Sequence, residues 1–379
     1  MLNFSSVDAI LDDAVQRICP SAQIEVLWHG KPVHAQAYGF LDPETRRHPT
    51  RGDSLFDLAS VTKLFTTATF MTLVEAGKVS LDQPVHTVLP EFSGLRPIRG
   101  YENPLDWGKT VSVSDAEGQI DAESITYRNL LIHNSGLPAW RPFKDQVDAA
   151  SAYRMALETF FSYPTGEKII YSDVGLILLG LSLERLTGQK LDEAIYSRVT
   201  LPLGLSLTRF LPVDGQPYAT ENIAPTEFCN WRKRRILGEV HDENAWRLGG
   251  VAGHAGLFSC AAEVARFGQM YLEGGAPLLH PGTVAEMTRQ QAEFNGTRRG
   301  IGFALWSADP EASSNPFSPL TFGHTGFTGT CVWMDPEREL VVALLTNDVY
   351  AGRAERGIAP LRVAAHHAVV EAIDRELAA

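Results

Sequence analysis

The segment from Leu58 to Ala76 constrains the fold more than any other part of the sequence, because a helix over it is apolar on nearly every side. A helix of that kind belongs in a protein interior and not on a surface. Gly77 follows directly and is typical of a residue that ends a helix. The sequence therefore predicts a long helix buried inside the molecule.

The same helix carries Ser60 and Lys63, the only Ser-x-x-Lys in the chain. Residues three apart share a helix face, so the hydroxyl and the amine can meet within one turn. Burial disfavours an ammonium, so Lys63 must pair with a partner or lose its proton, and a neutral amine beside a hydroxyl is a general base. Backbone N–H groups at the helix start also favour negative charge near Ser60. This pattern predicts a nucleophilic serine; the alternative is a solvated lysine and a serine that only caps the helix.

Length and composition limit the class of protein. The 379 residues suffice for one large domain or two intimately joined ones, and the net charge of −12 argues against nucleic acid and anionic membranes as partners. No apolar stretch reaches the ~20 residues that a membrane span needs. The first residues lack the basic and apolar regions of a signal peptide. We therefore expect a cytoplasmic protein as given, or a periplasmic or extracellular one if an export segment has been removed.

Strand-like and helical patterns are distributed unevenly along the chain. Strands are predicted near both ends, at residues 24–28, 33–38, 331–334 and 340–345. Helical patterns beyond the Ser60 helix occur at residues 7–18, 127–134, 147–161, 173–187 and 358–377. Residues 80–126 and 202–247 are loop-like. This order favours an α+β fold in which residues 1–70 and 300–379 form an α/β sheet domain and residues 71–299 a mainly helical domain with long loops, the active site lying between them.

A second motif lies at Tyr171-Ser172-Asp173, just ahead of an apolar helical run. In the simpler interpretation Ser172 or Asp173 caps that helix and Tyr171 packs against it. In the functional interpretation the Tyr171 phenol lies beside Ser60 and Lys63, where the nearby cation lowers its pKa and makes it a proton shuttle.

A third motif, His324-Thr325-Gly326, stands in a glycine-rich segment immediately before the strand that begins near Cys331. It is either an ordinary hairpin with an incidental histidine or an edge strand along which substrate lies. In the second case glycine lets two backbones approach closely, and His324 supplies a positive or hydrogen-bonding group at the mouth of the pocket.

Taken together and in this order, the three motifs resemble the signature of the serine β-lactamase and penicillin-binding protein superfamily. The tyrosine in the second motif resembles the class C branch, with its DD-peptidase and esterase relatives. The resemblance extends over about residues 20–375. It implies a β-lactamase/transpeptidase-like fold, a five-stranded antiparallel sheet flanked by helices with an all-helical insertion.

The resemblance also implies roles for particular residues. Ser60 would attack an acyl carbon to form an acyl-enzyme, while Lys63 and Tyr171 move the proton to the leaving group. The backbone N–H groups of Ser60 and Phe327 would form the oxyanion hole. The remaining motif positions would bind substrate: Asp173, His324, Thr325 and Gly326.

Two positions depart from the family pattern. Asp173 stands where the family has Asn, so a carboxylate that only accepts hydrogen bonds replaces an amide that also donates. This carboxylate would pair with Lys63 or favour a substrate that carries an N–H or amine. His324 stands where β-lactamases usually carry Lys, and its charge is not fixed at neutral pH. Both changes argue against efficient destruction of penicillins, and they leave serine acyl transfer intact.

The leading hypothesis is a serine hydrolase that acts on an amide or ester through an acyl-enzyme. A D-amino-acid peptide ranks ahead of a small ester and a β-lactam as substrate. The alternative is a catalytically silent binding or scaffolding protein on the same fold. The expected partner is a small-molecule or peptide substrate, and the oligomeric state does not follow from the sequence.

Two other groups of residues are weighed and set aside. His241-Asp242-Glu243 and His254 match no common zinc spacing, so we expect no metal and no cofactor. The basic run at residues 232–235 is expected to be a solvated face, because the surrounding charge is acidic.

Overall fold

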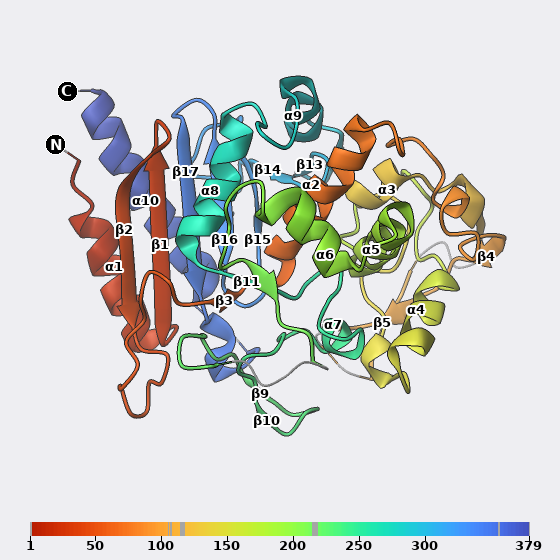
Figure 1. Cartoon of the computed structure of the whole chain (residues 1–379), viewed down its shortest axis with the longest axis horizontal. Helices are drawn as coiled ribbons and strands as arrows, with labels where there is room; N and C mark the ends of the chain where they lie inside the picture. The colour runs from red at the N-terminus through yellow and green to blue at the C-terminus, as the bar shows by residue number, and fades with distance from the viewer. Residues whose placement is uncertain are drawn as a thin grey trace.

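An antiparallel sheet organises one side of the molecule (Figure 1). The computed structural model describes residues 2–104, 106, 108–113, 118–213, 219–354 and 357–378. Within them the largest sheet has eight strands in the order β12-β13-β14-β15-β16-β17-β1-β2, and each neighbouring pair is antiparallel. Its strands are β1 (Ser21–Trp28), β2 (Lys31–Gly39), β12 (Ala292–Phe294), β13 (Thr297–Arg299), β14 (Ala304–Leu305), β15 (Phe322–Thr325), β16 (Cys331–Asp335) and β17 (Leu340–Thr346).

The helix predicted around Ser60 is confirmed as an interior element. It begins as a 3-10 turn at Ala59–Val61 and continues as α2, whose residues are buried without interruption from Thr62 to Met71. Figure 1 shows α2 between the sheet and the helices α5 and α6, both of which contact it. The α-helices in the described residues are α1 (Ser5–Arg17), α2 (Thr62–Glu75), α3 (Tyr127–Leu131), α4 (Ala149–Leu157), α5 (Asp173–Thr187), α6 (Leu191–Ile195), α7 (Glu243–Arg247), α8 (Ala261–Leu272), α9 (Pro281–Thr288) and α10 (Ile358–Leu377).

Helices cover both faces of the sheet because its central strands are apolar on both faces. Every residue of β17 is buried, as expected for a strand enclosed on two sides. Val342 and Leu344 pack in the core beneath α1 and α10. Val341, Ala343 and Leu345 belong to the larger core on the opposite face, where α8 contacts β1, β16 and β17. The sheet therefore separates a small core at the two chain ends from the large core that contains α2.

The two loop-like stretches carry only short pairings. The remaining strands are β3 (Phe56–Asp57), β4 (Leu95–Pro97), β5 (Tyr101–Glu102), β6 (Thr110–Val111), β7 (Gln119–Asp121), β8 (Arg209–Phe210), β9 (Phe228–Cys229), β10 (Arg234–Arg235) and β11 (Leu257–Ser259). They form sheets of two or three strands. The order β3-β11-β8 matters most for the site, because β3 leads directly into the turn that carries Ser60.

The predicted α+β class, with an antiparallel sheet flanked by helices, is confirmed. The implied number of five strands is wrong, because β12, β13 and β14 extend the sheet beyond β15. These strands have only two or three residues each, too few for an alternating pattern to appear in the sequence. The division into a sheet domain and a helical domain stays a prediction; the sheet draws its strands from residues 21–39 and 292–346. No helix in the described parts of the chain is long and apolar enough to cross a bilayer.

Candidate active site

Ser60 lies on a strained turn between β3 and α2. The preceding residue, Ala59, has a left-handed φ of 45°, which costs a residue with a side chain ~1–2 kcal/mol. The buried carboxylate of Asp57 holds this turn, since Oδ1 accepts the N–H of Ala59 at 2.8 Å and Oδ2 accepts the N–H of His241 at 2.6 Å. The surrounding structure therefore holds Ala59 in its strained conformation through hydrogen bonds. Backbone strain held in this way is typical of functional sites.

The Lys63 ammonium has three partners and almost no exposed surface. Nζ lies 2.9 Å from Ser60 Oγ, 3.0 Å from the carbonyl oxygen of His254 and 2.8 Å from Asp173 Oδ1. Burial lowers the pKa of Lys63, but the Asp173 carboxylate and Tyr171 together more than offset this, and the net pKa is raised above the ordinary value of lysine. Of the two outcomes that the sequence left open, pairing or loss of the proton, the structure shows pairing. Lys63 is a cation that donates toward the serine oxygen.

Tyr171 packs over this cation from the start of α5. Its ring centroid lies 4.8 Å from Lys63 Nζ and 4.6 Å from the ring centroid of His133. The prediction that the cation lowers the pKa of Tyr171 is wrong in its net result. Burial raises that pKa, and the attraction of Lys63 offsets only part of the rise. Tyr171 is therefore a neutral phenol, and its role as a proton shuttle stays a prediction.

The third motif approaches the serine turn through its glycine. A Cβ on Gly326 would stand 2.5 Å from the carbonyl oxygen of Leu58, so no larger residue fits. Thr330 Oγ1 donates to the same carbonyl at 2.9 Å, and Arg362 Nη2 donates to the carbonyls of Gly326 and Thr330, each at 2.8 Å. Phe327 follows Gly326 directly, so its backbone runs beside this turn. Its N–H as an oxyanion donor stays a prediction.

His324 is buried, and its electrostatic state differs from the positive group that the sequence allowed. Its Nδ1 lies 2.7 Å from the carbonyl oxygen of Thr325, which pairs with Cys331 in the sheet. Because a carbonyl only accepts, Nδ1 carries the proton and Nε2 presents a lone pair. Burial, reinforced by nearby cations, lowers the pKa of His324 to about 3. The residue is a neutral hydrogen-bonding group, its ring centroid 5.7 Å from that of Tyr171.

Arg299 is a site residue that sequence reasoning missed. It ends β13, and its guanidinium carbon lies 5.4 Å from the ring centroid of Tyr171. Burial lowers the pKa of Arg299, and no side chain in the described residues forms an ion pair with it. Nothing in the sequence singles out Arg299 from its neighbour Arg298. Side chains alternate between the two faces of a strand, and this strand is too short for its faces to be assigned from the sequence.

Buried polar atoms without a well-directed hydrogen bond gather around Ser60. Such atoms are rare in folded proteins, and a cluster of them suggests a place where a ligand supplies the missing partners. Three lie on residues that surround the serine and lysine: Tyr171 OH, Arg299 Nε and His324 Nε2. The structure thus brings the three sequence motifs together and adds Arg299 and His133 to them.

The histidines that were considered as metal ligands each form a contact with a carboxylate instead. His254 Nε2 lies 3.0 Å from Asp242 Oδ1, and His241 Nε2 lies 2.9 Å from Glu227 Oε1. Over the described ranges no group of three or more His, Cys, Asp or Glu side chains is placed to hold a metal ion. Glu243 contacts Arg353 at 2.5 Å.

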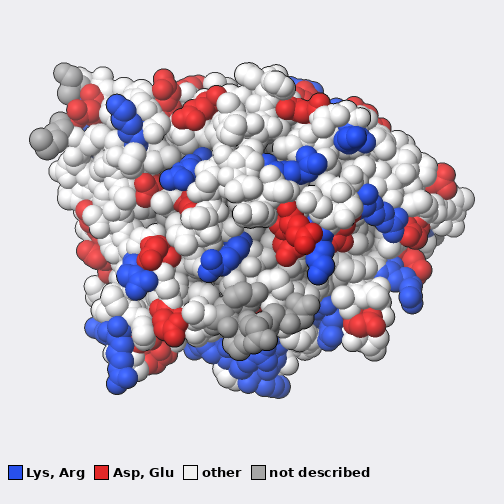
Figure 2. Space-filling view, viewed as in Figure 1, with Lys and Arg blue, Asp and Glu red and all other residues white. Residues whose placement is uncertain are grey.

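The basic run at 232–235 is only in part the solvated face that the sequence predicted: Lys233 and Arg234 are exposed, whereas Arg232 and Arg235 pack against the protein. The Arg232 side chain is only 3% exposed and donates to the carbonyl oxygens of Val240 and His241. Arg235 donates to the carbonyl oxygen of Tyr350. Figure 2 shows acidic and basic side chains interspersed, with basic ones gathered at the lower edge where Figure 1 places the β9–β10 hairpin. Arg232 and Arg235 therefore tie the hairpin to the protein, while Lys233 and Arg234 remain on its surface.

The fold and the Ser60–Lys63 pair define a class, the serine hydrolases built on the fold shared by β-lactamases and penicillin-binding proteins. The chain belongs to the Beta-lactamase family, whose family model matches residues 7–366. A putative D-alanyl-D-alanine carboxypeptidase of Salmonella paratyphi B is 30% identical over 93% of this chain and 84% of its own length.

Solved structures support the same fold. EstCE1, described as a hydrolase with promiscuous acyltransferase activity, has a TM-score of 0.72 at 22% identity and covers 96% of this chain and 97% of its own. The octameric penicillin-binding protein homologue from Pyrococcus abyssi has a TM-score of 0.69 at 22% identity, covering 91% of this chain and 74% of its own. At these identities the likeness establishes the fold alone.

Proposed function

We propose that this protein is a serine carboxypeptidase that removes the last residue from peptides ending in a D-amino acid, through an acyl-enzyme at Ser60. The observation that carries this choice is Arg299, a half-buried guanidinium beside Tyr171 whose Nε is buried and which has no carboxylate partner in the described residues. An unpaired cation that is partly withdrawn from solvent at the edge of a site favours an anion on the ligand. The free carboxylate of a peptide supplies one, whereas a simple ester does not. The carboxypeptidase description of the Salmonella relative points to the same substrate class.

The first step is attack by Ser60 Oγ on the carbonyl carbon of the last peptide bond. Lys63 already lies 2.9 Å from this oxygen as an ammonium, so it stabilises the negative charge that develops there and does not take the proton. The N–H groups of Ser60 and Phe327 receive the carbonyl oxygen as it becomes an oxyanion. Loss of one such donor typically costs ~2.7–4 kcal/mol of the barrier.

The proton travels through Tyr171. As Ser60 attacks, its O–H proton passes to the phenol oxygen while the phenol proton passes to the leaving nitrogen. The C–N bond breaks, the free amino acid departs, and Tyr171 ends as it began, a neutral phenol. Water then attacks the ester at Ser60, and the same exchange in reverse returns a proton to Ser60 and releases the shortened peptide.

Two acceptors lie beside the reacting groups, Asp173 next to Lys63 and His324 next to Tyr171. Asp173 accepts from Lys63 and can also accept an N–H of the acyl part of the substrate. His324 presents the lone pair of Nε2 and accepts a donor from substrate or solvent. The cationic lysine that β-lactamases usually carry is absent at position 324. This arrangement supports a peptidase in preference to a β-lactamase.

The carboxylate requirement can be tested with one peptide in two forms. We expect the protein to release D-alanine from a peptide ending in D-Ala-D-Ala and to act poorly on the same peptide with a C-terminal amide. Arg299→Gln should lower kcat/KM for the free acid about 30-fold or more, since removal of one partner from a buried charge pair costs 2–5 kcal/mol. The amide should be nearly unaffected.

Arg298→Gln is the matched control. Arg298 precedes Arg299 on β13 but donates to Gln290 Oε1 at 2.6 Å and to the Trp306 carbonyl at 3.3 Å. Equal cleavage of acid and amide by the unaltered protein would contradict the proposed substrate class. Absence of any turnover of peptides and short esters would favour the alternative of a binding or scaffolding protein.

A further inference from the structure

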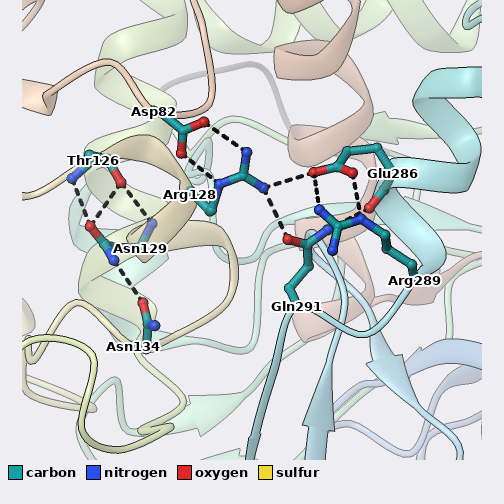
Figure 3. Close-up of polar contacts among 8 residues, drawn as sticks. All are labelled: Asp82, Thr126, Arg128, Asn129, Asn134, Glu286, Arg289 and Gln291. Atoms are coloured by element: carbon teal, nitrogen blue, oxygen red, sulfur yellow. Dashed lines mark hydrogen bonds and ion pairs between the residues drawn. The ribbon is translucent and has the colours of Figure 1, made fainter.

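A polar network joins the helices beside the candidate site to the edge of the sheet (Figure 3). Its centre is Arg128 in the first turn of α3. Nε and Nη2 of Arg128 donate to Asp82 at 2.6 and 2.9 Å. Nη1 donates to Glu286 Oε1 at 2.9 Å and to Gln291 Oε1 at 3.0 Å. One guanidinium therefore holds the loop that follows α2, the end of α9 and the segment that enters β12.

In one direction this network leads to Tyr171. The helix α3, which contains Arg128, ends at Leu131. His133 follows shortly after it in a left-handed conformation with φ 60°. The carbonyl oxygen of His133 accepts the N–H of Ile170 at 2.8 Å, and its Nδ1 accepts the N–H of Ser172 at 3.1 Å. His133 thus holds the backbone on both sides of Tyr171 and packs on its ring.

In the other direction the network leads to Arg299. The backbone N–H of Gln291 donates to the carbonyl oxygen of Arg299 at 2.8 Å, and the next residue, Ala292, pairs with Arg299 in the sheet. The Gln291 side chain is fixed at both ends, because Oε1 accepts from Arg128 and Nε2 donates to the carbonyl oxygen of Glu286 at 2.7 Å. Two hydrogen bonds therefore connect Arg128 to the backbone of Arg299.

We propose that the Arg128–Gln291 link sets the spacing between Tyr171 and Arg299, which makes Arg128 and Gln291 positioning residues for substrates whose leaving group carries a carboxylate. The inference rests on the proposed function. In such a substrate the leaving residue bears both the nitrogen that Tyr171 protonates and the carboxylate that Arg299 binds. The two groups are a fixed distance apart on one amino acid, so the two protein side chains must match that distance.

The test compares two substrates that share one acyl part. One releases D-alanine, with its carboxylate, and the other releases a neutral alcohol. Gln291→Ala removes the link to Arg128 without removing a charge or touching substrate. We expect KM for the carboxylated substrate to rise about 2- to 30-fold, the range of coupling through a packed network, while kcat and KM for the neutral ester stay unchanged.

The control disrupts an exposed carboxylate–arginine pair elsewhere on the helical side by replacing its carboxylate. Glu91 accepts two hydrogen bonds from Arg185, and Glu91→Gln should change neither substrate. Thermal melting establishes that each variant folds. Should Gln291→Ala fail to fold, Arg128→Lys, which retains the charge but lacks the forked donors, should show the same selective rise in KM.

Two results would overturn the inference: an equal loss on both substrates, or no change on either. Arg299→Gln separates this failure from failure of the proposed function. If Arg299→Gln raises KM for the carboxylated substrate and Gln291→Ala does not, only the positioning inference is wrong. If Arg299→Gln itself leaves the carboxylated substrate unaffected, the proposed carboxylate site is wrong.

Discussion

Replacement of Asp173 by Asn tests which state of Lys63 the reaction uses. The two charges are 2.8 Å apart in a buried setting, where a gross attraction of ~6 kcal/mol follows from an effective dielectric constant of about 20. Because solvation and other partners offset much of this, a neighbouring opposite charge typically contributes ~1.4–4 kcal/mol to the charged state. Asparagine keeps the shape and one acceptor oxygen, and it removes that contribution.

The assay is kcat/KM for a neutral ester measured from pH 6 to pH 10. The Asp173 carboxylate raises the pKa of Lys63 after burial has lowered it, so the unaltered protein should keep its activity toward the alkaline end. In Asp173→Asn the alkaline fall should move at least one pH unit toward neutrality, because Lys63 then loses its proton more easily. A variant whose activity instead rises with pH would show that Lys63 acts as a general base, and it would refute the reasoning.

Substitutions at three further positions, Phe327, Ala59 and Glu25, have defined outcomes. Phe327→Pro removes the proposed oxyanion N–H and should lower kcat about 100-fold or more, while Phe327→Ala keeps that N–H and most of the activity; similar rates in both variants would exclude this donor. Ala59→Gly relieves the left-handed φ of 45° and should raise the free energy of unfolding by ~1 kcal/mol in urea titration; a loss of stability would contradict strain at this turn.

Burial raises the pKa of Glu25 to about 7, above its unfolded value, so the folded state loses stability as pH rises through 7. Glu25→Gln should therefore stabilise the protein by ~1–2 kcal/mol at pH 8, after allowance for partial solvent screening, and change little at pH 5; equal melting shifts at both pH values would contradict this.

The sequence predicted those parts of the fold in which long hydrophobic patterns decide the structure. The Ser60 helix, α5 and α10 were found because apolar residues fill their faces over three or more turns. β1 and β17 were found because each contains a short run rich in apolar residues, which is typical of a strand enclosed on both faces. The short strands β12, β13 and β14 were missed, because two or three residues carry no period and their pairing depends on the finished sheet.

In the candidate site, too, the sequence predicted some residues and missed others. Ser60, Lys63 and Tyr171 were found as residue types at informative spacings. Arg299 was missed because what marks it is the lack of a carboxylate partner among the described residues. Only the three-dimensional structure shows this. The net pKa change of Tyr171 was predicted with the wrong sign, since the sequence showed the neighbouring cation and not the depth of burial.

The central claim is that Ser60 carries the acyl group. It is tested most directly by rapid quenching of the protein with a D-Ala-D-Ala peptide or a reactive penicillin, followed by intact mass and peptide mapping. The account predicts a mass increase equal to the acyl part, confined to the peptide that contains Ser60 and absent in Ser60→Ala. An adduct on another residue, or turnover that survives in Ser60→Ala, would contradict it.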